Sequence, residues 1–238
     1  MNKYKFIYSS RHRYFLITIY LLIRLFLFKK IEAFNKKNTS WVAEFKNYLS
    51  GKKFNFTNDY FSHHVEYLVN LLNKLKIKEK KIKVLEIGCF EGMSTIFFLN
   101  FLSNCKITCV DPFKPAEELF QKNFNLVYDN FTSNTNDFKN RISLHKNTSN
   151  SFFKINRKKF DIVYIDGNHH YDFVLNDLIN SFDNLKINGI IIMDDFLWKY
   201  YEDINQNPIG AIKKFLFDNF FRVKILNINY QFVIQRIS

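Results

Sequence analysis

Four aspartates directly follow short apolar runs of this 238-residue sequence, where strands would end. Asp111 follows residues 106–110, Asp166 follows residues 160–165, and Asp194 and Asp195 follow residues 189–193. Ligands of open α/β sheets bind beyond the carboxyl ends of the strands. We therefore treat these aspartates as candidate site residues.

A divalent metal ion is the chemistry that Asp166, Asp194 and Asp195 suggest. Neighbouring strands would bring the three carboxylates to one rim, where they repel one another unless a cation lies between them. Oxygen ligands suit Mg²⁺, Mn²⁺ or Ca²⁺ better than Zn²⁺. Such an ion would orient a substrate hydroxyl and lower its pKa. The alternative is that these aspartates cap helices and hold loops.

A histidine follows Asp166 in the loop Asp166-Gly167-Asn168-His169-His170. Imidazole titrates near neutral pH, so a histidine here can accept a proton from a hydroxyl group. We expect His169 and Asp166 to take part in catalysis. A structural role in the loop is the alternative for both histidines.

A glycine-bearing loop, Gly88-Cys89-Phe90-Glu91-Gly92, lies between an apolar run and a helical stretch that begins at Met93. Glycine lets the backbone approach a ligand closely, and the N-terminus of the helix then faces that ligand. A carboxylate about twenty residues further on, here Asp111, can accept hydrogen bonds from both hydroxyls of a ribose. We expect Cys89 and Phe90 in the loop, together with Asp111, to contact a nucleotide-like cofactor. A helix cap or a turn before Pro112 is the alternative for Asp111.

Short apolar runs alternate with helical stretches after residue 82, which is typical of βαβ units and a parallel sheet. We predict an α/β, Rossmann-like doubly wound sheet, preceded by a helix from Asp59 or Tyr60 to about Leu75. The predicted strands are 83–87, 106–110, 141–145, 160–165 and 189–193, followed by a hairpin of 221–228 and 230–237.

The formal net charge of +13 is unevenly distributed. Residues 1–82 hold 17 Lys and Arg against 5 Asp and Glu, and residues 83–238 hold 18 against 17. The nearly neutral second part argues against a face that follows a phosphate backbone, so we expect no specific nucleic-acid partner. Cys89, Cys105 and Cys109 form no C-x-x-C pair, which favours reduced, buried thiols and a cytoplasmic protein.

The segment from Tyr14 to Phe28 is apolar apart from Thr18 and Arg24. Fifteen helical residues span about 22 Å, less than the roughly 30 Å of a bilayer core. A small-residue cleavage site does not follow, so a signal peptide fits poorly. We expect residues 11–30 to lie on the cytoplasmic face of a membrane. The alternative is a helix packed on the domain or on a second subunit of a homo-oligomer.

Four motifs in order resemble the class I S-adenosylmethionine-dependent methyltransferases, specifically the small-molecule O-methyltransferase-like group with an I-D-G-x-H-x-Y signature. The resemblance covers roughly residues 80–238. It implies a seven-stranded sheet with one antiparallel strand. The first loop departs from the commoner pattern by lacking a middle glycine, and Asn168 stands where relatives often carry an acid. The motifs are VLEIGCFEG at 84–92, CVDPF at 109–113, YIDGNHHYDFVLNDL at 164–178 and LKINGIIIMDDF at 185–196.

The resemblance also implies roles for individual residues. Glu86, Gly88 and Gly92 would line the methionine end of the cofactor, and Asp111 would bind its ribose. The segment from Asn147 to Ser149 would contact the adenine. The resemblance makes Asp166, Asp194 and Asp195 the metal ligands, and we place Asp166 at the edge of the cofactor as well.

The sequence therefore predicts methyl transfer from S-adenosylmethionine to a hydroxyl of a small molecule or sugar, with possible help from Mg²⁺ or another divalent cation. We divide the chain into an apolar basic leader (1–34), a helical extension (35–82) and a methyltransferase domain (83–238). One alternative is a non-catalytic, membrane-associated cofactor-binding protein. Another is an NAD(P)-dependent oxidoreductase, although its G-x-G-x-x-G loop is incomplete here.

Overall fold

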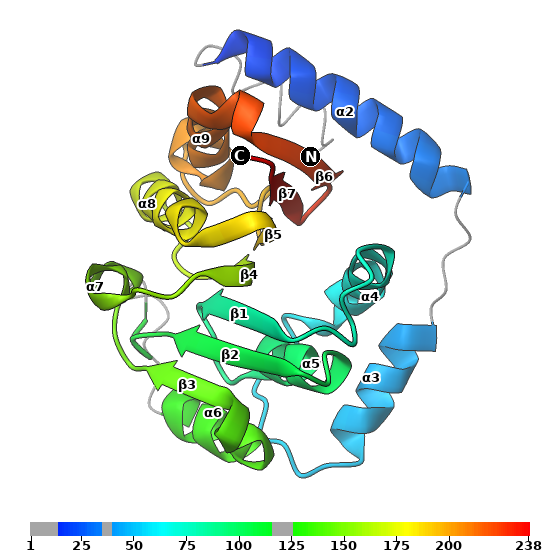
Figure 1. Ribbon diagram of the computed structural model, residues 1–238, viewed down its shortest axis with the longest axis vertical. Coiled ribbons are helices and arrows are strands. Elements are labelled where there is room, and N and C mark those ends of the chain that lie inside the picture. Colours follow the sequence, from blue (N-terminus) through cyan, green and yellow to red (C-terminus); the bar gives the residue numbers. More distant parts are fainter. Residues whose placement is uncertain (1–13, 35–39, 116–125) are drawn as a thin grey trace. The chain divides into compact units, whose positions relative to one another are not determined.

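The computed structural model describes residues 14–34, 40–115 and 126–238 (Figure 1). The chain divides into two compact units, one formed by residues 37–152 and the other by residues 153–238 together with the segment before residue 37. This division differs from the three parts predicted from the sequence, because the first described helix packs against elements near the end of the chain. We describe each unit by itself.

The unit of residues 37–152 contains three parallel strands in the order β3-β2-β1. They are β1 (Ile82–Ile87), β2 (Cys105–Val110) and β3 (Ile142–His145). Most side chains of β1 and β2 are buried, as expected for strands covered on both faces. The three cysteines of this unit are free, buried thiols, as predicted.

Helices connect and cover these three strands. The predicted helix from residue 59 or 60 begins later, because the Asp59 carboxylate first accepts hydrogen bonds from the N–H groups of Phe61 and Ser62. The chain then forms a 3-10 turn before the α-helix. The helices of this unit are α3 (Ser40–Ser50), η2 (Ser62–His64), α4 (Val65–Lys74), α5 (Met93–Phe101), α6 (Val127–Thr135) and η4 (Asn136–Arg141), and α7 (Ser149–Ile155) crosses into the second unit.

The second unit contains four strands in the order β4-β5-β7-β6. β4 (Phe160–Ile165) runs parallel to β5 (Leu185–Met193), and β7 (Phe232–Arg236) is antiparallel to both β5 and β6 (Val223–Ile228). The predicted C-terminal hairpin is therefore present. Its helices are α2 (Phe15–Phe34), α8 (Tyr171–Asp183), η5 (Ile204–Gln206), α9 (Pro208–Asn219) and η6 (Phe220–Arg222).

β5 starts four residues before its predicted start at residue 189. Its pairing with β4 shifts after Phe160, and Asn188 has a positive φ of 64° at this irregularity. A Cβ atom on Gly189 would lie 3.0 Å from the Asp161 carbonyl oxygen. The turn-forming residues Asn188 and Gly189 interrupt the hydrophobic pattern of β5. The first half of the strand is therefore not part of a continuous apolar run and was not predicted from the sequence.

The seven strands make a mixed sheet that is mostly parallel, with one antiparallel C-terminal strand, β7. This confirms the predicted α/β fold class. Among the helices that the structure describes, none is both long enough and apolar enough to cross a membrane.

Candidate functional site

The glycine-bearing loop after β1 has an unusual backbone. Gly88, Phe90 and Gly92 all have positive φ angles, at 81°, 45° and 88°. The Gly88 N–H donates to the Val110 carbonyl at the end of β2, over 3.0 Å. A Cβ on Gly92 would lie 2.9 Å from Thr135 Cγ2, so this glycine is required by the close packing of α6 as well as by its left-handed conformation.

Asp111 holds this loop in place. Its Oδ2 accepts hydrogen bonds from the N–H groups of Cys89 and Phe90, at 2.7 and 3.0 Å, and its Oδ1 accepts one from Phe113 at 2.6 Å. Burial raises the pKa of the Asp111 carboxyl, and these three N–H donors oppose that rise. A carboxylate has about four acceptor positions, so Asp111 retains capacity for a ribose hydroxyl. Its predicted ribose contact stays a prediction, and its role in shaping the loop is an additional one.

Glu86 is the residue before last of β1, two positions before Gly88, and it has no exposed surface. Its two carboxylate oxygens accept hydrogen bonds from the hydroxyls of Ser94 and Thr95, and Cys109 Sγ lies 3.6 Å from Oε2. Burial raises the pKa of Glu86 to about 7, against the effect of these donors. Glu86 therefore ties α5 to β1 in this structure, and its predicted contact with the methionine end stays a prediction.

A third acidic residue of this unit, Glu91, was given no role in the sequence analysis. It is 1% exposed, and its carboxylate accepts hydrogen bonds from the Thr57 N–H at 2.6 Å and from the Asn130 amide at 2.8 Å. The buried Asn134 amide donates to the Glu91 carbonyl and also bonds the backbone of Asn55. The chain before α4 is thus fastened to the loop.

Asn147 and Ser149 follow β3, as the adenine prediction requires. The Asn147 side chain is exposed and accepts a hydrogen bond from the Thr148 N–H at 2.8 Å. Ser149 begins α7. Both residues follow β3, a strand of the unit that also contains Asp111. Their predicted contact with the adenine stays a prediction.

The second unit brings Asp166, His169 and Asp195 together. His169 Nε2 lies 2.6 Å from Asp195 Oδ2 and 3.8 Å from Asp166 Oδ1. Burial by itself would lower the pKa of His169, but the two carboxylates raise it well above its usual range. Burial raises the pKa of Asp166, and the negative charges of Asp194 and Asp195 raise it further against the opposing effect of His169. At neutral pH the imidazole is therefore a cation between two acids.

Asp194 has a different environment from the one predicted. Its Oδ2 accepts hydrogen bonds from the Tyr164 hydroxyl and the Gln231 amide, and its Oδ1 accepts one from the Asp195 N–H. Tyr164 lies on β4, Gln231 directly precedes β7, and Asp194 is only 8% exposed. Within the described residues, the grouping of ligand atoms includes Asp166, His169 and Asp195 but leaves Asp194 out. The predicted ligand set of three aspartates stays a prediction, and in this structure Asp194 fixes the end of β5.

Two aromatic residues that the sequence analysis missed adjoin this cluster. The Trp198 ring stacks on the His169 ring with centroids 4.8 Å apart, and a hydrogen bond to Asp195 adds to burial in raising the pKa of the Tyr230 hydroxyl. Tyr200 in turn stacks on Trp198. No local pattern marks these residues, since their relevance depends on where the chain returns after β5 and β6.

The donor set of Asp166, His169 and Asp195 fits a divalent metal ion. Their ligand atoms all lie within 4.8 Å of one another, and two carboxylates with an imidazole are suitable ligands for such an ion. A second grouping, Glu86 with Cys89 and Cys109, is fully buried. Burial raises the pKa values of both of its thiols, so they stay protonated and are poor ligands.

Comparison with known proteins adds to this geometry. A family model described as "Methyltransferase domain" matches residues 85–196. This span contains the glycine loop, Asp111 and the candidate residues Asp166, Asp194 and Asp195. No curated protein sequence matches the chain closely enough to count as a relative.

Solved structures share the fold at low identity. The O-methyltransferase from Bacillus cereus, in complex with SAH, is 14% identical with a TM-score of 0.55, and the match covers 88% of this chain and 96% of that one. The SAH-bound methyltransferase PaMTH1 from Podospora anserina is 14% identical with a TM-score of 0.55, covering 89% and 94%. The MycE methyltransferase of mycinamycin biosynthesis, solved with Mg, SAH and mycinamycin VI, is 15% identical with a TM-score of 0.59. That match covers 83% of this chain and 55% of MycE, so the chain spans about half of the MycE length.

Proposed function

We propose that this protein transfers a methyl group from S-adenosylmethionine to a hydroxyl oxygen of a small molecule or sugar, because residues 85–196 match a methyltransferase domain family. The observation that carries the proposal is the loop of Gly88–Gly92, which Asp111 holds by two backbone N–H groups inside that matched span. O-methyltransferases are among the structures that share the fold, which supports oxygen as the acceptor atom.

The unit of residues 37–152 carries the groups proposed to bind the cofactor. When bound, S-adenosylmethionine supplies an electrophilic methyl group on a positively charged sulfur. Asp111 would accept hydrogen bonds from the ribose hydroxyls with the lone pairs that the loop leaves unused. Because three N–H groups already orient its carboxylate, this contact would require little reorganisation.

The other unit carries the groups proposed for proton transfer. As the acceptor oxygen bonds to the methyl carbon, the bond from carbon to sulfur breaks and the hydroxyl proton must leave. Asp166 is the proposed proton acceptor at a pH above its raised pKa of about 8, where its carboxylate is charged and is a stronger base than an ordinary carboxylate. Its side chain is 34% exposed. His169, a cation in this environment, would hold Asp166 and Asp195 in place rather than act as the base.

A divalent ion held by Asp166, His169 and Asp195 would lower the pKa of a bound hydroxyl. The presence of Mg in the MycE structure supports metal assistance as part of the proposal. His169 would have to lose its extra proton to bind such an ion, so the ion and the proton compete for the same nitrogen.

Calorimetric titration of the full chain with S-adenosylmethionine, and separately with NAD, tests the cofactor first. We expect binding of S-adenosylmethionine alone, and then formation of S-adenosylhomocysteine with at least one member of a panel of sugars and phenols. Binding of NAD alone would overturn the proposal in favour of an oxidoreductase. Cofactor binding with no turnover over a broad panel, with and without Mg²⁺ or Mn²⁺, would favour the non-catalytic alternative.

A further inference from the structure

The helix α2 has two distinct faces. Ile17, Thr18, Leu21 and Leu25 are buried and recur at helical spacing, which places them on one side of the helix. α2 packs through contacts with α9 and β6. This side is therefore occupied by the protein itself.

Polar contacts fix α2 in this position. The Lys213 ammonium on α9 donates to the Thr18 hydroxyl over 2.8 Å, and the Arg24 guanidinium donates to the Ile225 carbonyl of β6 over 2.6 Å. Lys213 is fully buried. The Arg24 guanidinium is therefore used in a contact inside the unit.

The opposite side of α2 is apolar and exposed. Leu16 is 77% exposed, and five other large apolar side chains recur with it at helical spacing. The full set, which we call the outer face, is Phe15, Leu16, Ile19, Ile23, Phe26 and Leu27. Contact of apolar side chains with water is unfavourable. A continuous group of exposed apolar side chains therefore indicates a surface that binds a partner or a membrane.

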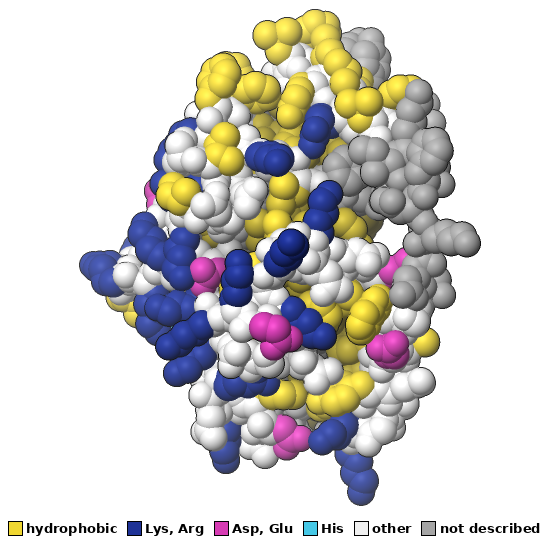
Figure 2. Space-filling view, turned by 45° about the vertical axis from the view of Figure 1, so that its right-hand side comes forward, with side chains coloured by type: hydrophobic (Ala, Val, Ile, Leu, Met, Phe, Trp, Pro, Cys, Tyr) yellow, Lys and Arg dark blue, Asp and Glu magenta, His cyan; other side chains and the backbone are white. Residues whose placement is uncertain are grey.

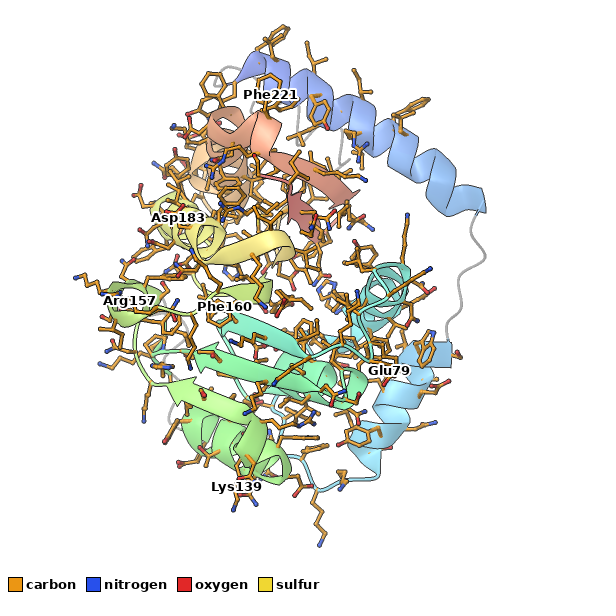
Figure 3. The ribbon with its side chains drawn as sticks, viewed as in Figure 1. Glu79, Lys139, Arg157, Phe160, Asp183 and Phe221 are labelled. Carbon is orange, nitrogen blue, oxygen red and sulfur yellow. The ribbon has the colours of Figure 1, made fainter. Side chains whose placement is uncertain are left out.

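The outer face continues onto the end of α9 and onto η6. The Tyr20 ring lies 5.0 Å from the Phe220 ring, Phe220 lies 5.4 Å from Phe221, and Phe221 is 88% exposed. Figure 3 shows Phe221 close to the first part of α2, in agreement with these contacts. The space-filling view shows hydrophobic side chains gathered in its upper part, with a few Lys and Arg side chains below them (Figure 2).

Positive charge accompanies this surface. Residues 1–34 contain seven Lys and Arg against one Glu, including Arg11 and Arg13 before the helix and Lys29 and Lys30 in its last part. Among the described residues, Arg222 and Lys224 lie just beyond Phe221 and are exposed. A second copy of this chain would bring identical cations face to face in a two-fold dimer, where they repel. Acidic headgroups would instead complement them.

We propose that the outer face of α2, together with Phe221, binds an anionic lipid surface, with α2 lying along the surface while its buried side stays packed on α9 and β6. This inference is independent of the proposed methyl transfer. The apolar side chains would enter the boundary between headgroups and acyl chains, and the flanking cations would pair with the headgroups.

Flotation of the full-length protein with vesicles tests this proposal. We expect binding to vesicles of phosphatidylcholine mixed with phosphatidylglycerol, and much weaker binding to phosphatidylcholine alone. Adding salt should weaken the binding, because it screens the attraction between exposed charges. Equal binding to both kinds of vesicle, or binding to neither, would overturn the proposal.

A variant and its control identify the surface involved. Leu16→Glu with Ile23→Glu and Phe26→Glu should reduce vesicle binding about tenfold or more, since three apolar anchors become charges. The matched control carries Ile155→Glu, Ile179→Glu and Ile187→Glu, at exposed apolar positions of the same unit outside α2, and should bind as the parent does. A similar loss in both variants would contradict a role for α2.

Sedimentation of the parent protein separates the lipid surface from a second copy. We expect the parent protein to show no self-association through α2 when vesicles are absent. A parent dimer that the three outer-face substitutions convert to monomer, without any vesicle binding, would replace the lipid surface by a second subunit. Retained calorimetric binding of S-adenosylmethionine by the outer-face variant would show that it has folded.

Discussion

In the unit of residues 37–152, buried carboxylates are held by neutral donors, whereas in the other unit two carboxylates share a histidine cation. Glu86 and Asp111 accept hydrogen bonds from hydroxyl and N–H groups that the same loop and helix supply. Asp166 and Asp195 both lie near His169 Nε2. The carboxylates of Glu86 and Asp111 therefore need no further charge. Those of Asp166 and Asp195 depend on a positive charge between them, which either a proton on His169 or a metal ion can provide.

The largest effect should come from removing the proposed base. Asp166→Asn keeps the size of the side chain but cannot accept a proton, so we expect methyl transfer to fall about 10²-fold or more, with S-adenosylmethionine binding nearly unchanged. Initial rates of S-adenosylhomocysteine formation measure the first quantity and calorimetry the second. Asp172→Asn, at an exposed position of α8, is the control and should keep full activity. Parent-like turnover by Asp166→Asn would remove Asp166 from the reaction.

A pH effect on stability should mark the first region. The pKa of Glu86 is raised to about 7 in the folded protein from an ordinary value of 4.5, so between these values the folded state binds more protons than the unfolded state. The contribution of Glu86 to stability is therefore complete below pH 4.5 and is lost as the pH rises through 7. The loss amounts to about 3 kcal/mol.

Urea unfolding at a series of pH values measures this loss in the parent protein and in Glu86→Gln. Glutamine can accept a hydrogen bond from one of the Ser94 and Thr95 hydroxyls and donate one to the other, and it does not titrate. We expect the variant to lose the part of the pH dependence that lies between 4.5 and 7. An identical profile in both proteins would show that Glu86 does not titrate in that range.

A smaller effect should follow from releasing the glycine loop. Asp111→Ala removes the acceptor for three N–H groups, so the affinity for S-adenosylmethionine should fall tenfold or more, equivalent to about 1 to 3 kcal/mol. Calorimetry of the full-length variant measures this affinity. Asp129→Ala on α6 provides a comparison at a different acidic residue of the same unit, and its affinity should match the parent value. Unchanged affinity in Asp111→Ala would remove this residue from the cofactor site.

The pair Asp194 and Asp195 gives the sharpest test of the shared cation, although its effect should be the smallest. Asp195→Asn should weaken any Mn²⁺ or Mg²⁺ stimulation about tenfold, because it removes a carboxylate from the grouping around His169. Asp194→Asn should leave the concentration of ion needed for half-maximal activity unchanged, since Asp194 bonds to Tyr164 and Gln231. Equal dependence on the ion in both variants would contradict the assignment, as would full activity of the parent protein after treatment with a chelator.

Much of the fold could be predicted from the sequence because buried strands are continuous apolar runs. The predicted strands 83–87 and 160–165 coincide with β1 and β4 almost residue for residue. The first half of β5 could not be found, because Asn188 and Gly189 interrupt it and its pairing compensates with a local irregularity.

The types and positions of the site residues could be predicted from the sequence more readily than their hydrogen-bond partners. The positions of Asp111, Asp166 and Asp195 at strand ends follow from the pattern of apolar runs, but the partners of Asp194 come from β4 and from the residue before β7. Glu91 received no role, since its contacts with Thr57 and Asn130 join segments that are far apart in the sequence. The predicted cytoplasmic location and homo-oligomer stay predictions.

The contact between Arg24 and Ile225 joins residues 201 positions apart in the chain. During synthesis α2 is made long before α9 and β6, against which it packs. Until those elements have been made, the helix has no protein surface for its inner face, and both of its faces are open to chaperones or to lipid. The order of synthesis therefore makes the docking of α2 on β6 wait for about two hundred further residues to be added.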